Sequence, residues 1–462
     1  MPAHLDSRRF RATDQRAFAR LSGDVNPIHL DSTCARRTIA GQCIVHGVHA
    51  ALWVLDAIAR RSIAVAGLQA RFLKPMFLDE EIACIWDESS GKAQLSSNGT
   101  PLVEITLSPQ RPAVGTAAVA SVPGREAPAD RSFEEAAGMP PQAFDIHGES
   151  DLAGTLFPDA TRLYGQQLVC ELAALSYIVG MEVPGMHSLF SGLRVGIHDL
   201  TEASVFSIAG SDERFKRLLI SVTGRSLNAE IEAFQRPAPT SMPPLRALRH
   251  RVRPNEHAGV TALVVGGSRG LGEVAAKLIA AGGGRVTITY RTGEEDAYRV
   301  VDDIRRSGGD CQARQLIIGE GAPPLGPLPA INQLYYFATP KIFGKRAGGY
   351  DDALYRSLRS VYVTGFEDLC KTLLARRGRR AVFYPSTVAI DAPPPELQEY
   401  ALAKSEGEAL CQRINDSDQI TILAPRLPRT ATDQTLSILQ VPAEDPVDLL
   451  APFVRRMTEL TR

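Results

Sequence analysis

Val265-Gly266-Gly267-Ser268-Arg269-Gly270-Leu271-Gly272 decides the fold of the later part of this chain. An apolar run ends at Val265, and an amphipathic helical pattern, residues 273–281, follows the glycines. A glycine turn between strand and helix is typical of dinucleotide-binding sheets, because glycine lets the backbone approach a pyrophosphate whose charge the helix N-terminus favours. The predicted cofactor-binding residues of this turn are Gly266, Ser268, Arg269, Gly270, Leu271 and Gly272.

Two further features lie downstream, Ser386 and the run Tyr400-Ala-Leu-Ala-Lys404. With the glycine turn, they make residues 257–462 resemble the short-chain dehydrogenase/reductase family. The resemblance implies that Tyr400 donates a proton and that Lys404 lowers the pKa of Tyr400 and holds the nicotinamide ribose. It also implies that Ser386 binds the substrate oxygen, although Ser386 precedes Tyr400 by 14 residues, one more than is usual.

The choice of cofactor is argued from charge. Arg291 follows the second predicted strand, where an acidic residue would bind a free 2′-hydroxyl, and Arg269 lies inside the glycine turn. Two guanidinium groups favour a 2′-phosphate, so we predict NADP (NADPH), although either arginine could instead be a solvated surface charge. The family resemblance adds Ala338, Pro425 and Thr430 to the expected cofactor contacts.

The same block departs from the family pattern at two motifs. Phe337-Ala338-Thr339 stands where the family has Asn-Ala-Gly. Tyr362-Val-Thr-Gly365 stands where the family has an asparagine that holds a water of the proton relay. Whether Tyr362 replaces that asparagine is left open by the sequence. These departures favour an alternative in which the module binds cofactor but is catalytically idle and serves assembly or sensing.

A second motif lies near the N-terminus, Ser22-Gly23-Asp24-Val25-Asn26-Pro27-Ile28-His29. Ile44-Val45-His46-Gly47 follows it at the head of an apolar helical pattern. The pair of motifs resembles the MaoC-like R-specific enoyl-thioester hydratases and dehydratases, whose fold is the hotdog, a long helix wrapped by an antiparallel sheet.

Adding or removing water across the Cα–Cβ bond of a thioester needs two proton carriers near the same carbons. Asp24 and His29 supply both if their environments push their pKa values apart. Asn26 would orient one of them or the water, and the backbone N–H near Gly47 is the expected oxyanion site. Which of Asp24 and His29 handles the water is left open.

Two Pro-rich, polar stretches predict linkers at residues 113–139 and 239–256. They separate a hotdog domain at 1–112, a second, degenerate hotdog at 140–238, and the reductase-like block at 257–462. The predicted fold class is an α+β double hotdog followed by an α/β, Rossmann-like, doubly wound parallel sheet. The second hotdog lacks an Asp-x-x-x-x-His motif, so a structural role is favoured for it.

The composition is that of an ordinary globular protein, with 44% hydrophobic and 22% charged residues and a formal charge of −1. Such a charge gives no field to attract nucleic acid or an anionic membrane. Seven scattered cysteines without a Cys-x-x-Cys motif predict neither disulfides nor a metal site. We expect a cytoplasmic homo-oligomer without a membrane span.

A dehydratase and a ketoreductase on one chain share one logical substrate, the 3-hydroxyacyl thioester. The sequence therefore predicts a bifunctional enzyme. One site would interconvert 3-oxoacyl and 3-hydroxyacyl groups with NADPH, and the other 3-hydroxyacyl and trans-2-enoyl groups. Whether coenzyme A or acyl carrier protein bears the acyl group is left open, as are the chain length and the direction.

Overall fold

The computed structural model describes residues 2–109, 119–319, 330–340, 342, 349–374, 380–415, 420–437 and 441–462. The chain forms two compact units, whose main parts are Met1–Ala238 and Pro239–Leu436 with Val441–Arg462. Each unit has its own buried core. The predicted blocks 1–112 and 140–238 thus share one unit.

The first unit is built on a ten-stranded sheet in the order β1-β3-β4-β5-β2-β7-β10-β9-β8-β6, in which every described pair is antiparallel. Its strands are β1 (Ala3–Arg9), β2 (Val65–Phe72), β3 (Glu81–Asp87), β4 (Lys92–Ser97), β5 (Thr100–Pro109), β6 (Gln142–Ala143), β7 (Ser188–Ile197), β8 (Val205–Asp212), β9 (Arg217–Thr223) and β10 (Leu227–Gln235).

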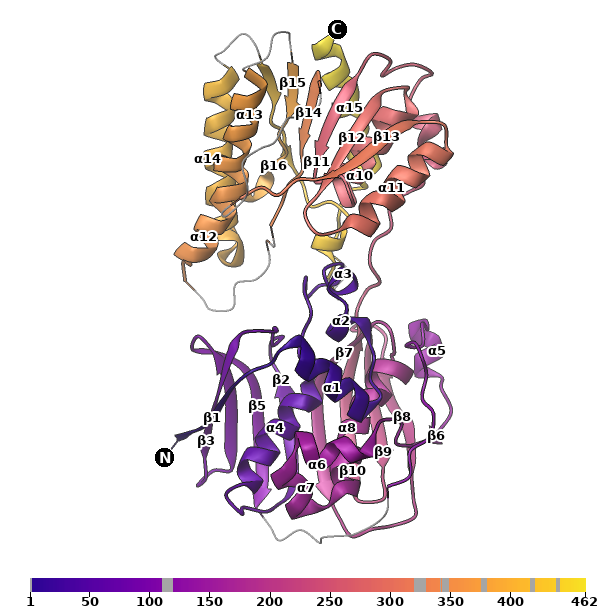
Figure 1. Cartoon of the computed structure of the whole chain (residues 1–462), viewed down its shortest axis with the longest axis vertical. Helices are drawn as coiled ribbons and strands as arrows, with labels where there is room; N and C mark the ends of the chain where they lie inside the picture. Colours follow the sequence, from indigo (N-terminus) through magenta and orange to yellow (C-terminus); the bar gives the residue numbers. More distant parts are fainter. Residues whose placement is uncertain are drawn as a thin grey trace. The chain divides into compact units, whose positions relative to one another are not determined.

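Two long helices of this unit contact each other over the sheet, α4 (Gly47–Ala59) and α8 (Gln166–Tyr177) (Figure 1). Nearly all their residues are buried, as expected for helices that are apolar all round. A π-helical turn, η2 (Ile178–Glu182), continues α8. The shorter helices are α1 (Ala12–Ser22), α2 (Pro27–Leu30), α3 (Ser32–Ala35), α5 (Phe133–Ala137), α6 (Ala153–Leu156) and α7 (Pro158–Tyr164).

Strands β2 and β7 join the two halves of this sheet, with Gly67 paired to Gly196 and Arg71 to Gly192. A Cβ on Gly67 would lie 2.4 Å from the carbonyl oxygen of Val195, so only glycine allows this close approach. The ladder makes the sheet continuous, and each half thereby covers an edge that the other would leave exposed.

The second unit holds a six-stranded parallel sheet in the order β13-β12-β11-β14-β15-β17. This is the Rossmann-like order, with the strand before the glycine turn in the middle. The strands are β11 (Thr261–Val265), β12 (Arg285–Tyr290), β13 (Asp310–Gln315), β14 (Gln333–Tyr336), β15 (Arg380–Phe383) and β17 (Ile420–Leu423). A separate parallel pair consists of β16 (Ser386–Thr387) and β18 (Arg426–Leu427).

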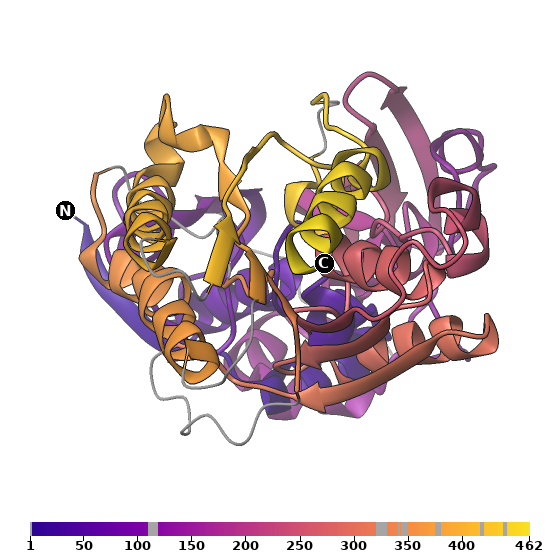
Figure 2. The same cartoon turned by 90° about the horizontal axis from the view of Figure 1, so that it is seen from above.

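Helices cover both faces of the parallel sheet (Figures 1 and 2). Along β11, Ala262 and Val264 face one core cluster, whereas Leu263 and Val265 face the other. This explains why the strand is apolar throughout instead of alternating. The helices are α10 (Gly270–Ala281), α11 (Glu294–Arg306), α12 (Asp352–Arg359), α13 (Phe366–Leu374), α14 (Gln398–Asn415) and α15 (Pro446–Thr461), with a π-helical turn, η4 (Ser360–Gly365), between α12 and α13.

The predicted linker 239–256 is wrong as an extended segment. It contains α9 (Leu245–Leu248), and Met242, Leu245 and Leu248 belong to the core of the second unit. The buried ammonium of Lys277 donates to the carbonyl of Pro243 at 2.8 Å, and the backbone N–H of Leu245 donates to Asp303. Backbone hydrogen bonds to buried charges, which composition does not reveal, hold this Pro-rich stretch.

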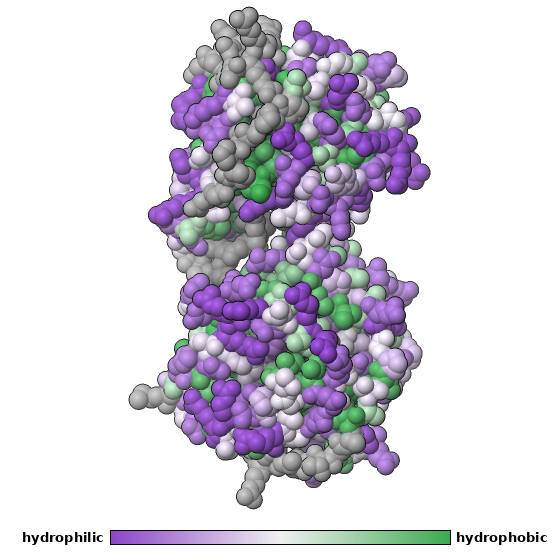
Figure 3. All heavy atoms as spheres, in the orientation of Figure 1, coloured by the Kyte–Doolittle hydropathy of each residue, from purple (hydrophilic) through white to green (hydrophobic). Residues whose placement is uncertain are grey.

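The predicted linker 113–139 is partly packed as well. Residues 113–118 lie outside the described part of the chain, but Phe133 and Ala136 of α5 are buried in the core of the first unit. No helix among the described residues is both long and apolar enough to cross a membrane. Hydrophilic side chains are spread over the described surface of both units (Figure 3).

Candidate functional site

The N-terminal motif folds into two short turns that present Asp24 and His29. Helix α1 ends at Ser22, and Gly23 closes it in the left-handed conformation with φ 78°. Asn26 then caps α2 by accepting from the N–H of Ile28, and Pro27 occupies the first helical position. Asp24 therefore precedes the second turn and His29 lies within it, as the spacing of the motif requires.

Asp24 is almost fully buried, with 1% of its surface exposed, and both carboxylate oxygens accept hydrogen bonds. The backbone N–H of Asn26 donates to Oδ1 at 3.1 Å, and the hydroxyl of Ser176 donates to Oδ2 at 2.7 Å. A Cβ on Gly180 would lie 2.3 Å from Oδ1. Helix α8 therefore supplies a hydrogen-bond donor to this carboxylate, and the η2 turn supplies a glycine packed against it.

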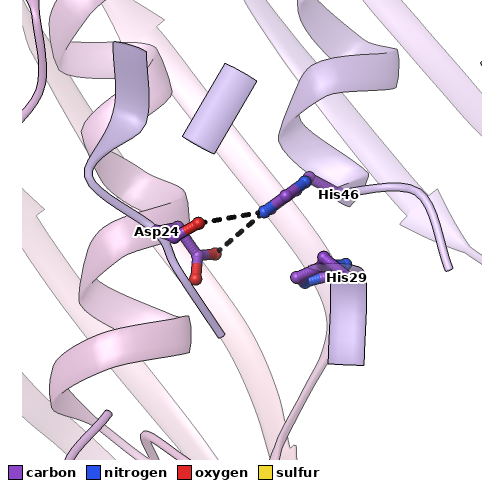
Figure 4. A group of neighbouring side chains, drawn as sticks. All are labelled: Asp24, His29 and His46. Atoms are coloured by element: carbon purple, nitrogen blue, oxygen red, sulfur yellow. Dashed lines mark hydrogen bonds and ion pairs between the residues drawn. The ribbon is translucent and has the colours of Figure 1, made fainter. Parts of the chain in front are cut away.

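Two imidazoles face Asp24 (Figure 4), and both are oriented through Nδ1. Nδ1 of His29 donates to the carbonyl of Ile44 at 2.8 Å. Nδ1 of His46 donates to Oε1 of Gln15 at 2.8 Å, an oxygen that also accepts from the backbone N–H of His46 at 3.0 Å. The rings of His29 and His46 stack at 3.7 Å. Each imidazole thus keeps Nε2 for chemistry.

Nε2 of His46 lies 3.3 Å from the backbone oxygen of Asp24 and 3.8 Å from its Oδ2 (Figure 4). Because Nδ1 already carries the donated proton, the contact with the backbone oxygen is attractive only if Nε2 is protonated as well. The contact with Oδ2 is attractive if either His46 or Asp24 holds one proton more. Ligand atoms of Asp24, His29 and His46 all lie within 4.8 Å of one another. The prediction of no metal stays a prediction.

Burial moves the pKa values of the acid–base pair in opposite directions. It raises the pKa of Asp24, against the charge of His29 and the hydrogen bonds from Ser176 and Asn26. It lowers the pKa of His29, against the charge of Asp24. Burial thus favours the protonated form of Asp24 and the neutral form of His29, so that one group can donate a proton and the other can accept one. That the pKa values of the two groups lie apart stays a prediction.

Asn26 is held by backbone groups. Its side-chain N–H groups donate to the carbonyls of Gly180 and Gly185 at 2.9 and 3.1 Å, and its Oδ1 caps α2. A role of its amide toward water stays a prediction. Asn26 fixes the turn, and its backbone N–H orients Asp24.

The predicted oxyanion residue, Gly47, is the first residue of α4, where the N–H has no acceptor within the helix. A Cβ there would lie 2.9 Å from the ring of Phe72, so the position requires glycine. Its role in binding a thioester oxygen stays a prediction. Sequence reasoning missed Ser176, Gly180 and Gln15, because no motif marks residues that only meet the catalytic turn after folding.

In the second unit the hydroxyl of Ser386 is engaged within the protein, and its predicted role at the substrate stays a prediction. Its hydroxyl donates to Glu408 at 2.5 Å, and Glu408 is in turn held by Arg426. The neighbouring Thr387 instead hydrogen bonds the phenol of Tyr400. Burial raises the pKa of Tyr400 to about 12, and this hydrogen bond opposes the rise. The one-residue excess in the Ser386–Tyr400 spacing was the signal that pointed to Thr387.

Lys404 is enclosed by aromatic rings. Its ammonium donates to the carbonyl of Pro385 at 2.7 Å and lies 4.0 Å from the ring centre of Tyr362 and 4.8 Å from that of Tyr384. Burial lowers its pKa to about 7. The hydroxyl of Tyr384 donates to the backbone carbonyl of Tyr362 at 3.0 Å, and the hydroxyls of Tyr362 and Thr339 hydrogen bond each other. Tyr362 thus stacks against the ammonium instead of reproducing an asparagine.

The glycine turn fits a nucleotide. Gly266 and Gly270 have φ values of 79° and 58°, and a Cβ on Gly272 would lie 2.2 Å from the carbonyl of Gly266. Helix α10 begins at Gly270 with no side-chain cap, which leaves its first N–H groups for an anion.

The remaining predicted cofactor residues are placed as follows. Arg269 lies 3.6 Å from the carboxylate of Asp433, whereas Arg291 is exposed. Thr430 is buried and its hydroxyl donates to the carbonyl of Pro428. Ser268 is buried, while Leu271 and Ala338 are partly exposed and Pro425 accepts from the N–H of Ser386. Cofactor contacts of Arg269, Thr430 and the others remain predictions.

Comparison with known proteins identifies the N-terminal region. The family model described as MaoC like domain matches residues 2–104. This region is a MaoC-like domain. It contains Asp24, His29, His46 and Gly47, whereas Ser176 and Gly180 lie beyond it.

A 62-residue stretch, 13% of this chain, is 40% identical to the probable tetrahydroxynaphthalene reductase of Zymoseptoria tritici and spans 23% of that relative. Among solved structures, landomycin C-6 ketoreductase with bound NADP and rabelomycin has 20% identity and a TM-score of 0.38, covering 45% of this chain and 91% of that one. A short-chain dehydrogenase of Salmonella enterica has 18% identity and a TM-score of 0.39, with coverages of 45% and 93%. The chain thus joins a MaoC-like domain to a part similar to short-chain reductases.

Proposed function

We propose that the first unit is a double hotdog, residues 3–235, that hydrates trans-2-enoyl thioesters and dehydrates 3-hydroxyacyl thioesters. The observation that carries this proposal is the buried cluster of Asp24, His29 and His46, whose unshared lone pairs face one another. Burial raises the pKa of Asp24 and lowers that of His29, which favours a protonated acid beside a neutral base.

In this proposal the two carriers have separate tasks. Nε2 of neutral His29 takes a proton from water, and the resulting hydroxide attacks the β-carbon. Protonated Asp24 gives its proton to the α-carbon, and dehydration runs through the same steps in reverse. Ser176 holds Oδ2 of Asp24 in place, and the N–H of Gly47 binds the thioester oxygen as negative charge develops there.

The test is hydration of crotonyl thioesters of coenzyme A and of acyl carrier protein, followed by loss of the enoyl absorbance. Asp24→Asn and His29→Ala are each expected to lower kcat by about 10³-fold, the usual scale for a general acid or base. Activity retained in both variants would refute the assignment.

For the second unit we propose NADPH-dependent reduction of 3-oxoacyl thioesters. The backbone N–H groups at the start of α10 would hold the cofactor phosphates, and Arg291 the 2′-phosphate. When bound, NADPH supplies a hydride. Tyr400 gives the proton to the substrate oxygen. Thr387, whose single O–H hydrogen bonds Tyr400 in the free protein, would turn that O–H to the substrate oxygen.

A second candidate for this unit is an idle module that binds cofactor without turnover. Two contacts support the idle module. The ammonium of Lys404 is enclosed and donates to the carbonyl of Pro385, and the hydroxyl of Tyr384 donates to the backbone carbonyl of Tyr362, which a relay water would otherwise occupy. NADPH oxidation with an acetoacetyl thioester distinguishes the two. A rate no higher than that of Tyr400→Phe would favour the idle module, provided that NADPH still binds in calorimetry.

A further inference from the structure

Arg236 is a buried cation close to the proposed hydratase site. It directly follows β10 and has 4% of its surface exposed. Its backbone N–H donates to the carbonyl of His187, and Nη2 donates to the carbonyl of Met186, both at 2.8 Å. Nε and Nη1 are buried and have no hydrogen-bond partner among the described residues.

A guanidinium in this state lacks the partners that buried charges normally have. Burial lowers the pKa of Arg236 to about 10, so the group is still cationic at neutral pH. The thiol of Cys34 is the group that opposes this lowering, and no carboxylate of the described residues does so. The Nε and Nη1 groups of Arg236 can therefore bind an anionic oxygen group, and the described residues supply none.

One loop connects Arg236 to the catalytic turn. The side chain of Asn26 donates to the carbonyl of Gly185, and Met186 and His187, the next two residues, accept from Arg236. The charge of Arg236 also acts on the imidazole of His29 and lowers its pKa. The unpaired donors therefore lie near the end of the substrate that reacts.

We propose that Arg236 binds a carboxylate carried by the acyl group, so that the substrates of the MaoC-like domain are acidic enoyl and 3-hydroxyacyl thioesters. This inference rests on the proposed hydratase function. Carboxylates and phosphates are the anions that a guanidinium binds best. The phosphates of a carrier are separated from the thioester by the whole pantetheine arm, whereas Arg236 acts at His29. The carboxylate is therefore the better match.

The experiment uses N-acetylcysteamine thioesters, which carry no phosphate, with the full-length protein. Crotonyl is the neutral substrate, and glutaconyl is the trans-2-enoyl substrate with a terminal carboxylate. We expect Arg236→Gln to lower kcat/KM for glutaconyl by about 100-fold and for crotonyl by less than about 3-fold, as for removal of one partner of a buried charge pair. Arg236→Lys keeps the charge and should retain part of the preference. Arg194→Gln, an exposed residue of β7, is the matched control.

Equal losses for both thioesters, or no loss, would overturn the proposal. A loss seen only with coenzyme A thioesters would overturn it in favour of a carrier phosphate. If the wild-type protein hydrates neither substrate, the proposed function fails, and calorimetry decides the inference separately. Glutaconyl thioester should then bind the wild type more tightly than crotonyl thioester, and Arg236→Gln should abolish that difference; equal binding would refute the carboxylate site.

Discussion

The two candidate sites are both buried, but their polar groups are satisfied in different ways. Around Asp24 and His46, lone pairs face one another across 3.3 and 3.8 Å and need a proton to become attractive. Around Tyr400, the groups have partners within the protein, since Ser386 donates to Glu408 and Lys404 donates to the carbonyl of Pro385. Under the proposed functions, the first site can exchange protons as it stands, whereas the second would first have to release internal contacts.

This difference teaches that a motif and a working site are separate observations. Both units carry recognisable catalytic residues. In the MaoC-like domain, the described contacts leave the lone pairs of His46 and Asp24 facing each other. Ser176 of α8 and Gly180 of η2 also contact Asp24, and they belong to the half of the first unit that has no catalytic motif. The following variants test whether that half is part of the hydratase and whether the second unit is active.

Gly180→Ala should have the largest effect. The added methyl would lie 2.3 Å from Oδ1 of Asp24 and would displace the carboxylate, so we expect hydratase kcat to fall by about 10³-fold, as if the acid were lost. Gly154→Ala is the control, because no atom lies within 4 Å of its added Cβ. Wild-type kcat in Gly180→Ala would show that η2 plays no part in the site.

Thr387→Val should lower 3-oxoacyl thioester reduction by about 100-fold, the usual loss for one donor to a developing oxyanion. Ser386→Ala serves as the comparison, because its hydroxyl faces Glu408 and we expect a change of less than about 3-fold. The measurement is NADPH oxidation. The reverse order of the two effects would restore Ser386 as the catalytic hydroxyl.

Ser176→Ala should lower hydratase kcat by about 10-fold, since a hydrogen bond to a charged group is lost. That bond lowers the pKa of Asp24, so removing it raises this pKa further. The limb of the pH profile that reports Asp24 should therefore move to higher pH. A fall in rate with an unmoved limb would indicate a purely structural role.

The smallest effect concerns Lys404, whose pKa is lowered to about 7. The ammonium predominates below pH 7 and is lost as the pH rises through that value. Any reductase step that needs the cation should decline above about pH 7. Lys404→Arg, which stays charged, should remove this alkaline limb while Tyr400 remains in place. An unchanged limb in Lys404→Arg would assign it to another group.

The sequence predicted the parallel sheet well, because glycines, apolar strands and helical periods are local signals. It also predicted the meeting of Asp24 and His29, which lie on one short turn. The sequence-based prediction of an extended linker failed for residues 239–256. There the backbone of Pro243 accepts from Lys277, and the backbone N–H of Leu245 donates to Asp303. Ser176 and Arg236 were not foreseen either, since their roles arise only where distant segments pack together.

The central claim is that buried Asp24 and His29 exchange protons with a thioester-bound acyl group. Its most direct test is the pH dependence of kcat for crotonyl thioester hydration in the full-length protein and in Asp24→Asn and His29→Ala. The account predicts a bell-shaped profile in which the limb that reports Asp24 lies above the usual pKa of an aspartate and the limb that reports His29 lies below the usual pKa of a histidine, with both variants reduced about 10³-fold. Full activity in either variant, with an unchanged profile, would contradict it.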